Sequence, residues 1–104
     1  MAPIQSYSLK FAPEVIKHLD WIERKYHNLI RQTIGEQLIN TPDIETRNRK
    51  LLDKLTPGSS TWELRIGPNN RFRVLYEIEY DRKEVWILAI GIKEGNRLLI
   101  GGEE

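Results

Sequence analysis

Hydrophobic and polar residues alternate along most of the second half of the chain, with the period of two that is typical of half-buried strands. Short clusters of turn-forming residues, GPNN, DRK and EGN, interrupt this alternation. The pattern therefore predicts strands over residues 61–67, 71–80, 84–93 and 97–100. A shorter alternation in IQSYSLKFA, near the N-terminus, predicts one more strand.

Between the first strand and the others, apolar residues recur at helical spacing in two stretches. The first, PEVIKHLDWIERKY, begins at Pro13, a residue that suits the first turn of a helix because its missing N–H has no helical partner there. The second, LIRQTIGEQLIN, follows Asn28, which we expect to cap it, and Pro42 ends it. Because the link between them is very short, the helices should form an antiparallel hairpin. Residues 43–60 are expected to be a basic loop with a short anchored turn.

A chain of 104 residues, of which 39% are hydrophobic and 30% charged, has the size and composition of one globular domain. We expect residues 1–104 to form it. The predicted elements give an α+β fold, in which the N-terminal strand and the helical hairpin pack on one face of a mainly antiparallel sheet of four to five strands.

Composition excludes several classes of protein. The chain has no cysteine, which excludes a disulfide framework and a thiolate zinc site. Its first residues lack the features of a signal peptide, and no apolar run approaches the ~18 residues of a membrane span, so we expect a cytoplasmic protein with no membrane partner. The net charge is only +1, so any case for nucleic-acid binding depends on where the charges lie.

The alternation also predicts how the two strands around GPNN pair. If Ile66 lies opposite Phe72, every large apolar side chain of this hairpin falls on the face toward the helices, whereas a slip of one residue would expose them all. The same register places Arg65 directly opposite Arg73 on the other face of the sheet. Like charges in this position cost stability.

Other basic residues should gather on this second face. With Tyr80 opposite Glu84 at the DRK turn, Arg73 lies beside Gly91, which leaves room next to it. The cluster predicted on these strands comprises Arg65, Arg71, Arg73 and Lys93, and Arg97 is expected to join it from the last strand. The preceding loop is expected nearby, with Arg47, Arg49, Lys50 and Lys54.

Two interpretations of these charges remain open. A charged outer face is normal for a sheet, and Glu63, Glu77 and Glu79 would then form surface ion pairs worth ~0–1 kcal/mol each. The second interpretation is favoured because the two arginines face each other, whereas ion pairing would place a carboxylate opposite each arginine. Converging guanidiniums are typical of a site for phosphate, which arginine binds through two parallel hydrogen bonds. We therefore expect a phosphate-sized gap between Arg65 and Arg73.

The segments RNRKLLDKL, STWELRIGPNNRFRVLYEI and VWILAIGIKEGNRL resemble the RelE/ParE superfamily of toxins from type II toxin–antitoxin systems, and the resemblance runs over nearly the whole chain. It implies a toxin that cleaves messenger RNA on the ribosome, so that translation and growth stop, and that a cognate antitoxin protein neutralises. ParE-like members inhibit DNA gyrase instead, which is the alternative activity. A third hypothesis is a member with weakened catalysis that mainly binds its antitoxin and regulates transcription.

In RelE-like members, basic residues on these strands stabilise the scissile phosphate while the RNA 2′-hydroxyl attacks it. The resemblance aligns Arg65 with a catalytic lysine and Arg73 with the catalytic arginine, and Lys93 falls near a further basic position. No spacing of histidine, aspartate or glutamate supports a metal site, and we expect no cofactor. The residues expected to contact RNA are Arg47, Arg49, Lys50, Lys54, Arg71 and Arg97.

Two departures from the family concern proton transfer. RelE-like enzymes often have a lysine where this chain has Glu63. Many also have a tyrosine or histidine near the C-terminus that acts in proton transfer, whereas none follows Tyr80 here. Glu63 is a candidate general base by position, although an ion pair with Arg65 is the favoured interpretation, and Asp53 is a weaker candidate. Both histidines of the chain belong to the helical region, where we expect them to be solvated or packed.

Overall fold

The computed structural model describes residues 6–52 and 61–104. Its strands are β1 (Ser8–Phe11), β2 (Arg49–Leu51), β3 (Trp62–Ile66), β4 (Phe72–Glu79), β5 (Glu84–Glu94) and β6 (Arg97–Ile100). Its helices are α1 (Glu14–Leu19) and α2 (His27–Leu38), with 3₁₀ turns at Arg24–Tyr26 and Pro68–Asn70. No helix in these two ranges is long and apolar enough to cross a membrane.

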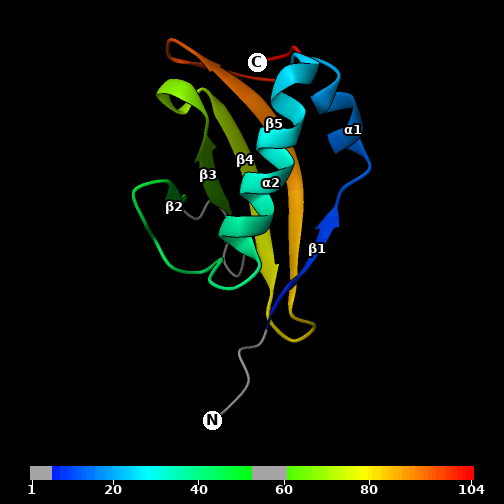
Figure 1. Cartoon of the computed structure of the whole chain (residues 1–104), viewed down its shortest axis with the longest axis vertical. Coiled ribbons are helices and arrows are strands. Elements are labelled where there is room, and N and C mark those ends of the chain that lie inside the picture. Colours follow the sequence, from blue (N-terminus) through cyan, green and yellow to red (C-terminus); the bar gives the residue numbers. More distant parts are fainter. Residues whose placement is uncertain (1–5, 53–60) are drawn as a thin grey trace.

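The strands form one sheet in the order β1-β5-β4-β3-β2, and β6 also pairs with β5. Strand β1 runs parallel to β5, and the other strand pairs are antiparallel. Both helices lie on the same face of the sheet (Figure 1). The predicted α+β fold is confirmed, and the sheet has six strands rather than the expected four to five.

The hydrophobic core fills the space between the helices and the sheet. Its buried side chains are Val15, Ile22, Ile30, Ile34, Leu38, Trp62, Leu64, Ile66, Phe72, Val74, Tyr76, Val85, Ile87 and Ile90. Because successive strand residues point to opposite faces, this core fixes which residues lie on the sheet face turned away from the helices. We call that second face the outer face.

The predicted pairing of β3 with β4 is confirmed, with Ile66 opposite Phe72 and Arg65 opposite Arg73. The predicted pairing of β4 with β5 holds at one end, where Arg73 lies opposite Gly91. It is wrong at the other end, because the register shifts between residues 75 and 76. This irregularity brings Val85 and Ile87 into the core and places Trp86 outside it, 38% exposed.

The first predicted helix is much shorter than its apolar spacing suggested. Helix α1 ends at Leu19, and the backbone turns so that Ile22 enters the core from outside the helix. The expected cap at Asn28 is also wrong, since α2 already begins at His27 with no side-chain cap. Instead, the ring of His27 bonds the carbonyl of Ile22 at 2.8 Å, which ties the link to the start of α2.

The loop expected over residues 43–60 contains a strand, because Arg49–Leu51 pairs with β3 as β2. Residues 53–60 lie outside the described part of the chain. In this register Arg49 lies opposite Leu64, so its side chain points toward the helices rather than to the outer face. The expectation that Arg49 lies with the basic residues of the outer face is therefore wrong.

The guanidinium of Arg49 closes the C-terminal end of α2. It donates to the carbonyls of Gln37, at 2.6 Å, and Thr41, and also to the hydroxyl of Thr46, at 3.4 Å. The last carbonyls of a helix have no partner within it, and a positive charge there also complements the helix dipole. Arg49 is 6% exposed, so its charge is stabilised by these oxygens in place of water.

Tyr76 makes a second link between the sheet and the loop after α2. Its hydroxyl donates to the carbonyl of Pro42 at 2.7 Å. Burial raises the pKa of Tyr76 above its ordinary value, so the hydroxyl stays protonated and available as a donor. Together with Arg49, it fixes the segment that leads from α2 to β2.

Replacing Arg49 with alanine should destabilise the protein strongly, because it leaves the carbonyls at the end of α2 without donors. We expect a loss of roughly 2–4 kcal/mol in the free energy of unfolding, measured by urea denaturation. The matched control is Lys50→Ala, which removes the same charge from the neighbouring, exposed residue and should change stability by less than about 0.5 kcal/mol. Equal effects of the two substitutions would contradict the structural role of Arg49.

Candidate phosphate site on the outer face

Two arginines lie side by side on the outer face, Arg65 from β3 and Arg73 from β4. Their positions follow from the core, since Leu64, Ile66 and Val74 next to them are buried on the helix side. The register alone would leave two positive charges facing each other. The structure therefore needs a compensating charge at this point.

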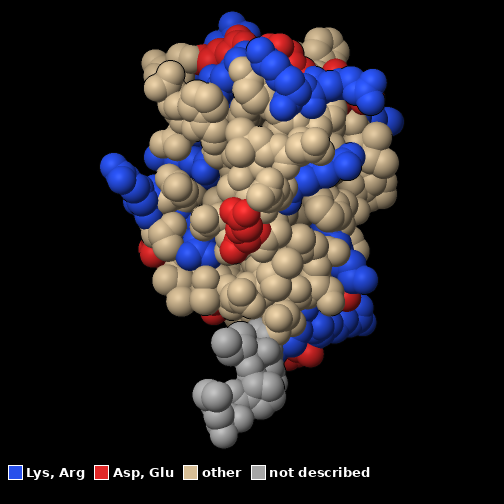
Figure 2. Space-filling model, viewed as in Figure 1, with Lys and Arg blue, Asp and Glu red and all other residues tan. Residues whose placement is uncertain are grey.

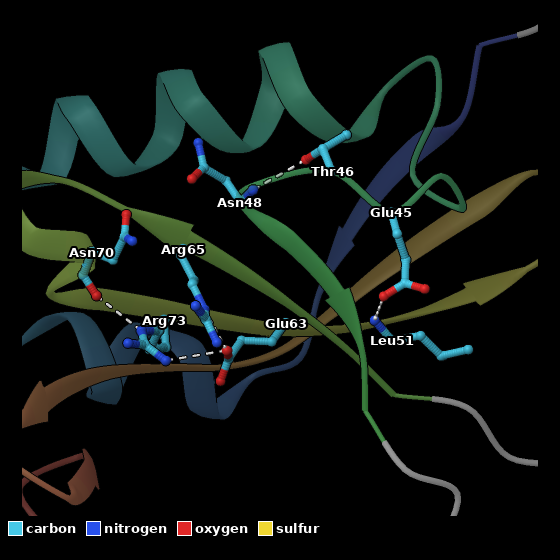
Figure 3. A network of polar contacts seen from close by, with 8 residues as sticks. All are labelled: Glu45, Thr46, Asn48, Leu51, Glu63, Arg65, Asn70 and Arg73. Atoms are coloured by element: carbon cyan, nitrogen blue, oxygen red, sulfur yellow. Dashed lines mark hydrogen bonds and ion pairs between the residues drawn. The ribbon is translucent and has the colours of Figure 1, made fainter.

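Glu63 supplies this charge. Its atom Oε1 accepts one hydrogen bond from Nε of Arg65 and another from a terminal amino group of Arg73, both at 3.1 Å. Figure 3 shows the three side chains pointing toward one another from β3 and β4. The side chains of Glu63 and Arg73 are only 11% and 13% exposed, and that of Arg65 is 33% exposed. We call these three residues the arginine–glutamate triad.

The triad confirms one expectation and corrects another. The ion pair between Glu63 and Arg65 is present, as the sequence suggested. The phosphate-sized gap between Arg65 and Arg73 is absent, because the carboxylate of Glu63 bridges them. A glutamate two residues before Arg65 on the same strand lies on the same face, so its long side chain can reach both guanidiniums.

The turn before β4 holds Arg73 from the other side. Nε of Arg73 donates to the carbonyl of Asn70 at 2.9 Å. Asn69 and Asn70 both have positive φ angles, 57° and 53°, a conformation that asparagine tolerates better than most residues. The GPNN sequence thus shapes a tight turn whose carbonyl fixes the orientation of the arginine.

Gly91 does not provide the room that we expected beside Arg73. A Cβ atom at this position would come within 2.8 Å of the carbonyl oxygen of Leu99 and 3.0 Å of the side chains of Leu98 and Ile100. Strand β6 therefore occupies this space. The glycine allows β6 to pack closely against β5, and it leaves no pocket for a ligand.

Arg71 and Lys93 lie together at the same end of the sheet as the triad. The backbone N–H of Lys93 donates to the carbonyl of Arg71 at 2.7 Å, which places the two residues next to each other. Arg71 is exposed, with its guanidinium 5.7 Å from the ring centre of Phe72, and Lys93 is partly exposed. Arg71 and Lys93 thus lie at the end of the sheet where the sequence predicted basic residues.

Two more of the predicted residues lie along the edge formed by β2. Lys50 is exposed and lies opposite Glu63, which places it on the outer face. Arg47 is exposed in the loop before β2, where the next residue, Asn48, accepts a hydrogen bond from the backbone of Arg65 at 2.8 Å. Both residues therefore extend the basic surface around the triad.

Of the remaining predicted residues, the structure describes Arg97, and it lies away from this surface. Arg97 pairs with Glu94, whose side chain is on the helix side, and it makes a 3.9 Å ion pair with Glu104, so the expectation that it joins the cluster is wrong. Lys54 and Asp53 lie outside the described residues.

The two histidines are engaged at the helices, as expected. Nδ1 of His18 accepts a hydrogen bond from the backbone of Ile90 at 3.3 Å, and the ring of His27 bonds the carbonyl of Ile22. Neither lies beside the triad. Within residues 6–52 and 61–104, no group of three or more histidine or acidic side chains is placed to hold a metal ion.

Comparison with solved structures finds the same fold in two toxin–antitoxin complexes. The first is RelBE2 from Mycobacterium tuberculosis, with a TM-score of 0.64 and 20% identity over 85% of this chain and 99% of the other. The second is the archaeal RelE–RelB complex from Pyrococcus horikoshii, with a TM-score of 0.60 and 19% identity over 88% and 98% of the two chains. No curated protein sequence matches the chain.

Residues 6–96 match the family described as the ParE toxin of the type II toxin–antitoxin system parDE. The match covers most of the chain, including β1, both helices and the strands that carry the triad. The protein is therefore a member of the ParE toxin family, within the RelE/ParE superfamily of type II toxins.

Proposed function

We propose that this toxin is an endoribonuclease that cleaves messenger RNA on the ribosome without a metal ion. The observation that supports this proposal is the convergence of Arg65 and Arg73 on a single anionic oxygen, that of Glu63. Two guanidiniums around one oxygen suit the non-bridging oxygen of a phosphodiester equally well. Both RelE-type structures that share the fold come from toxin–antitoxin complexes, which is consistent with this activity.

In the proposed reaction, the 2′-oxygen of the RNA attacks the adjacent phosphorus atom and the 5′-oxygen of the next nucleotide leaves, which gives a 2′,3′-cyclic phosphate. Arg65 and Arg73 stabilise the negative charge that grows on the phosphate oxygens in the transition state. Lys93, at the same end of the outer face, assists as a further positive charge. Glu63 holds the arginines, so water or a ribosomal group takes the proton of the 2′-hydroxyl, and water or a ribosomal group gives a proton to the leaving 5′-oxygen.

The exposed basic residues around the triad would bind the RNA backbone. Arg47, Lys50 and Arg71 are all exposed beside the strands that carry the triad. Contacts of this kind neutralise phosphates, position the RNA and weaken as salt increases, but they select no base sequence. Base or codon preference would then come from the ribosomal context.

Arg65→Ala and Arg73→Ala should each lower RNA cleavage by about 10²–10³-fold, the usual effect of removing one donor that stabilises transition-state charge. We would induce each variant in cells, follow growth and map RNA 5′ ends. The matched control is Arg97→Ala, which removes the same charge at an exposed position on the other side of the sheet and should remain toxic. Full toxicity of both single variants would contradict this assignment.

Gyrase inhibition is the second candidate function. It is favoured by the family that matches the chain, the ParE toxins, and by the absence of any tyrosine or histidine after Tyr80. Incubation of the pure toxin with gyrase and supercoiled DNA would detect trapped cleavage complexes. We expect none, together with cut messenger RNA in cells, and trapped complexes without cut RNA would establish the gyrase activity in its place.

We also propose an antitoxin partner that binds the helix-covered face. A groove of about 400 Å³ opens there between β1, α1 and α2, lined mainly by apolar residues that include Phe11, Ile16 and Ile34. Phe11 and Ile16 are 48% and 71% exposed, which is unusual for large apolar side chains that lie close together. In Figure 2, uncharged atoms cover much of this face around acidic atoms near its middle, and lysines and arginines lie mostly toward its margins.

Ile16→Glu should weaken binding to an antitoxin encoded by a neighbouring gene by about 100-fold, because it places a charge in the apolar groove. Pull-down or calorimetry with the purified pair would measure the loss. Toxicity should persist, since Ile16 lies on the side of the sheet away from the triad. The control is Lys17→Glu, a change at the adjacent exposed residue of α1 outside the groove, which should bind normally.

A further inference from the structure

Glu63 occupies the position between the two arginines that an anionic ligand would take. Glu63 is a strand residue on the outer face of the sheet, yet only 11% of its side chain is exposed. It contributes a negative charge next to two guanidiniums, so the triad carries a net charge of +1, that is, 2 − 1. The protein thus carries its own anion at the site proposed for phosphate.

The hydrogen bonds of the triad limit what an incoming phosphate can contact. Arg73 donates through Nε to Asn70 and through one amino group to Glu63, which leaves its other amino group. Arg65 donates through Nε to Glu63, and its two terminal amino groups have no acceptor among the described residues. A phosphate can therefore approach these outward donors, but it then lies close to the fixed carboxylate of Glu63.

The nearness of the two anions has an electrostatic consequence. The triad is mostly covered, so the repulsion between the carboxylate and the phosphate is screened less than it would be in water. We therefore expect an isolated phosphate to bind weakly. A phosphate becomes favourable there only when other contacts, such as those of the surrounding lysines and arginines, hold the RNA in place.

We propose that Glu63 is an intramolecular competitor, a positioning residue that orients Arg65 and Arg73 and keeps their affinity for free phosphodiesters low. This inference rests on the proposed function, because it takes RNA as the ligand of the triad. Its effect is specificity. Free RNA in the cell is bound weakly, and only a phosphate that additional contacts hold in place binds both arginines.

The test replaces Glu63 with glutamine, whose amide oxygen can still accept from both arginines but carries no charge. The probe is a fluorescent oligoribonucleotide with 2′-O-methyl groups, which cannot be cleaved, and binding is followed by anisotropy at 0.1 M salt. We expect Glu63→Gln to lower the Kd by about tenfold, the order expected when one like charge is removed close to the bound phosphate. With cleavable RNA, the variant should show a lower KM and no higher kcat.

Two controls separate this effect from general changes in charge. Glu79→Gln removes the same charge from the same face of β4, six residues from Arg73, which is roughly 20 Å along the strand and well beyond the Debye length. It should leave the Kd unchanged. The double variant Glu63→Gln/Arg65→Ala should lose the gain in affinity for the probe, because this gain depends on binding by the arginines.

The inference is overturned if Glu63→Gln binds the probe no more tightly than the wild type, or if the gain persists without Arg65. Thermal unfolding shows whether the variant is folded; if it is not, Glu63→Thr, which suits a strand and also lacks the charge, takes its place with the same expected result. The probe is not cleavable, so a gain that depends on Arg65 supports this inference even if the wild type cuts no RNA. In that case only the proposed function fails.

Discussion

The alternation of side chains along the hairpin of β3 and β4 is the constraint on which the rest of the structure depends. Trp62, Leu64 and Ile66 on β3 and their partners on β4 are all buried against the helices. A shift of one residue would expose this whole set, so the register has little freedom. The same register forces Arg65 and Arg73 together on the outer face. The site is therefore a direct consequence of how the core is built.

A like-charge pair in so rigid a position requires compensation from nearby groups. The carboxylate of Glu63 and the carbonyl of Asn70 provide it, and both are fixed by the same hairpin that creates the problem. Removing either partner would lower the stability of the fold, because a partly buried charge would then lose its counterpart. The hairpin thus holds three charged side chains in defined orientations without any contribution from the helices. A site of this kind is preorganised before any ligand arrives.

Much of this arrangement follows from sequence periodicity, and the remainder depends on contacts that periodicity does not encode. The register of β3 and β4 is predictable because six large apolar residues agree on one solution. The shift in β5 is not, since Trp86 and Leu88 fit the apolar pattern as well as Val85 and Ile87 do. The sequence pattern misplaces Arg49, because a basic residue in a polar segment resembles a surface residue until the end of α2 is placed beside it. Likewise, Glu63 was recognised as a partner of Arg65, but its reach to Arg73 depends on side-chain conformation.

The two proposed surfaces lie on opposite faces of the sheet, and this separation limits how a partner can neutralise the toxin. The apolar groove is on the helix side, whereas the triad is on the outer face. The molecule measures 27 Å along its shortest axis, the direction of view in Figure 1. An extended segment therefore needs at least about eight residues to span this thickness. A short helix in the groove would leave both arginines accessible. Under the proposed mechanism, neutralisation by such a partner requires either an extended segment that passes around an edge of the sheet, or enough bulk on the helix face to keep the toxin off the ribosome.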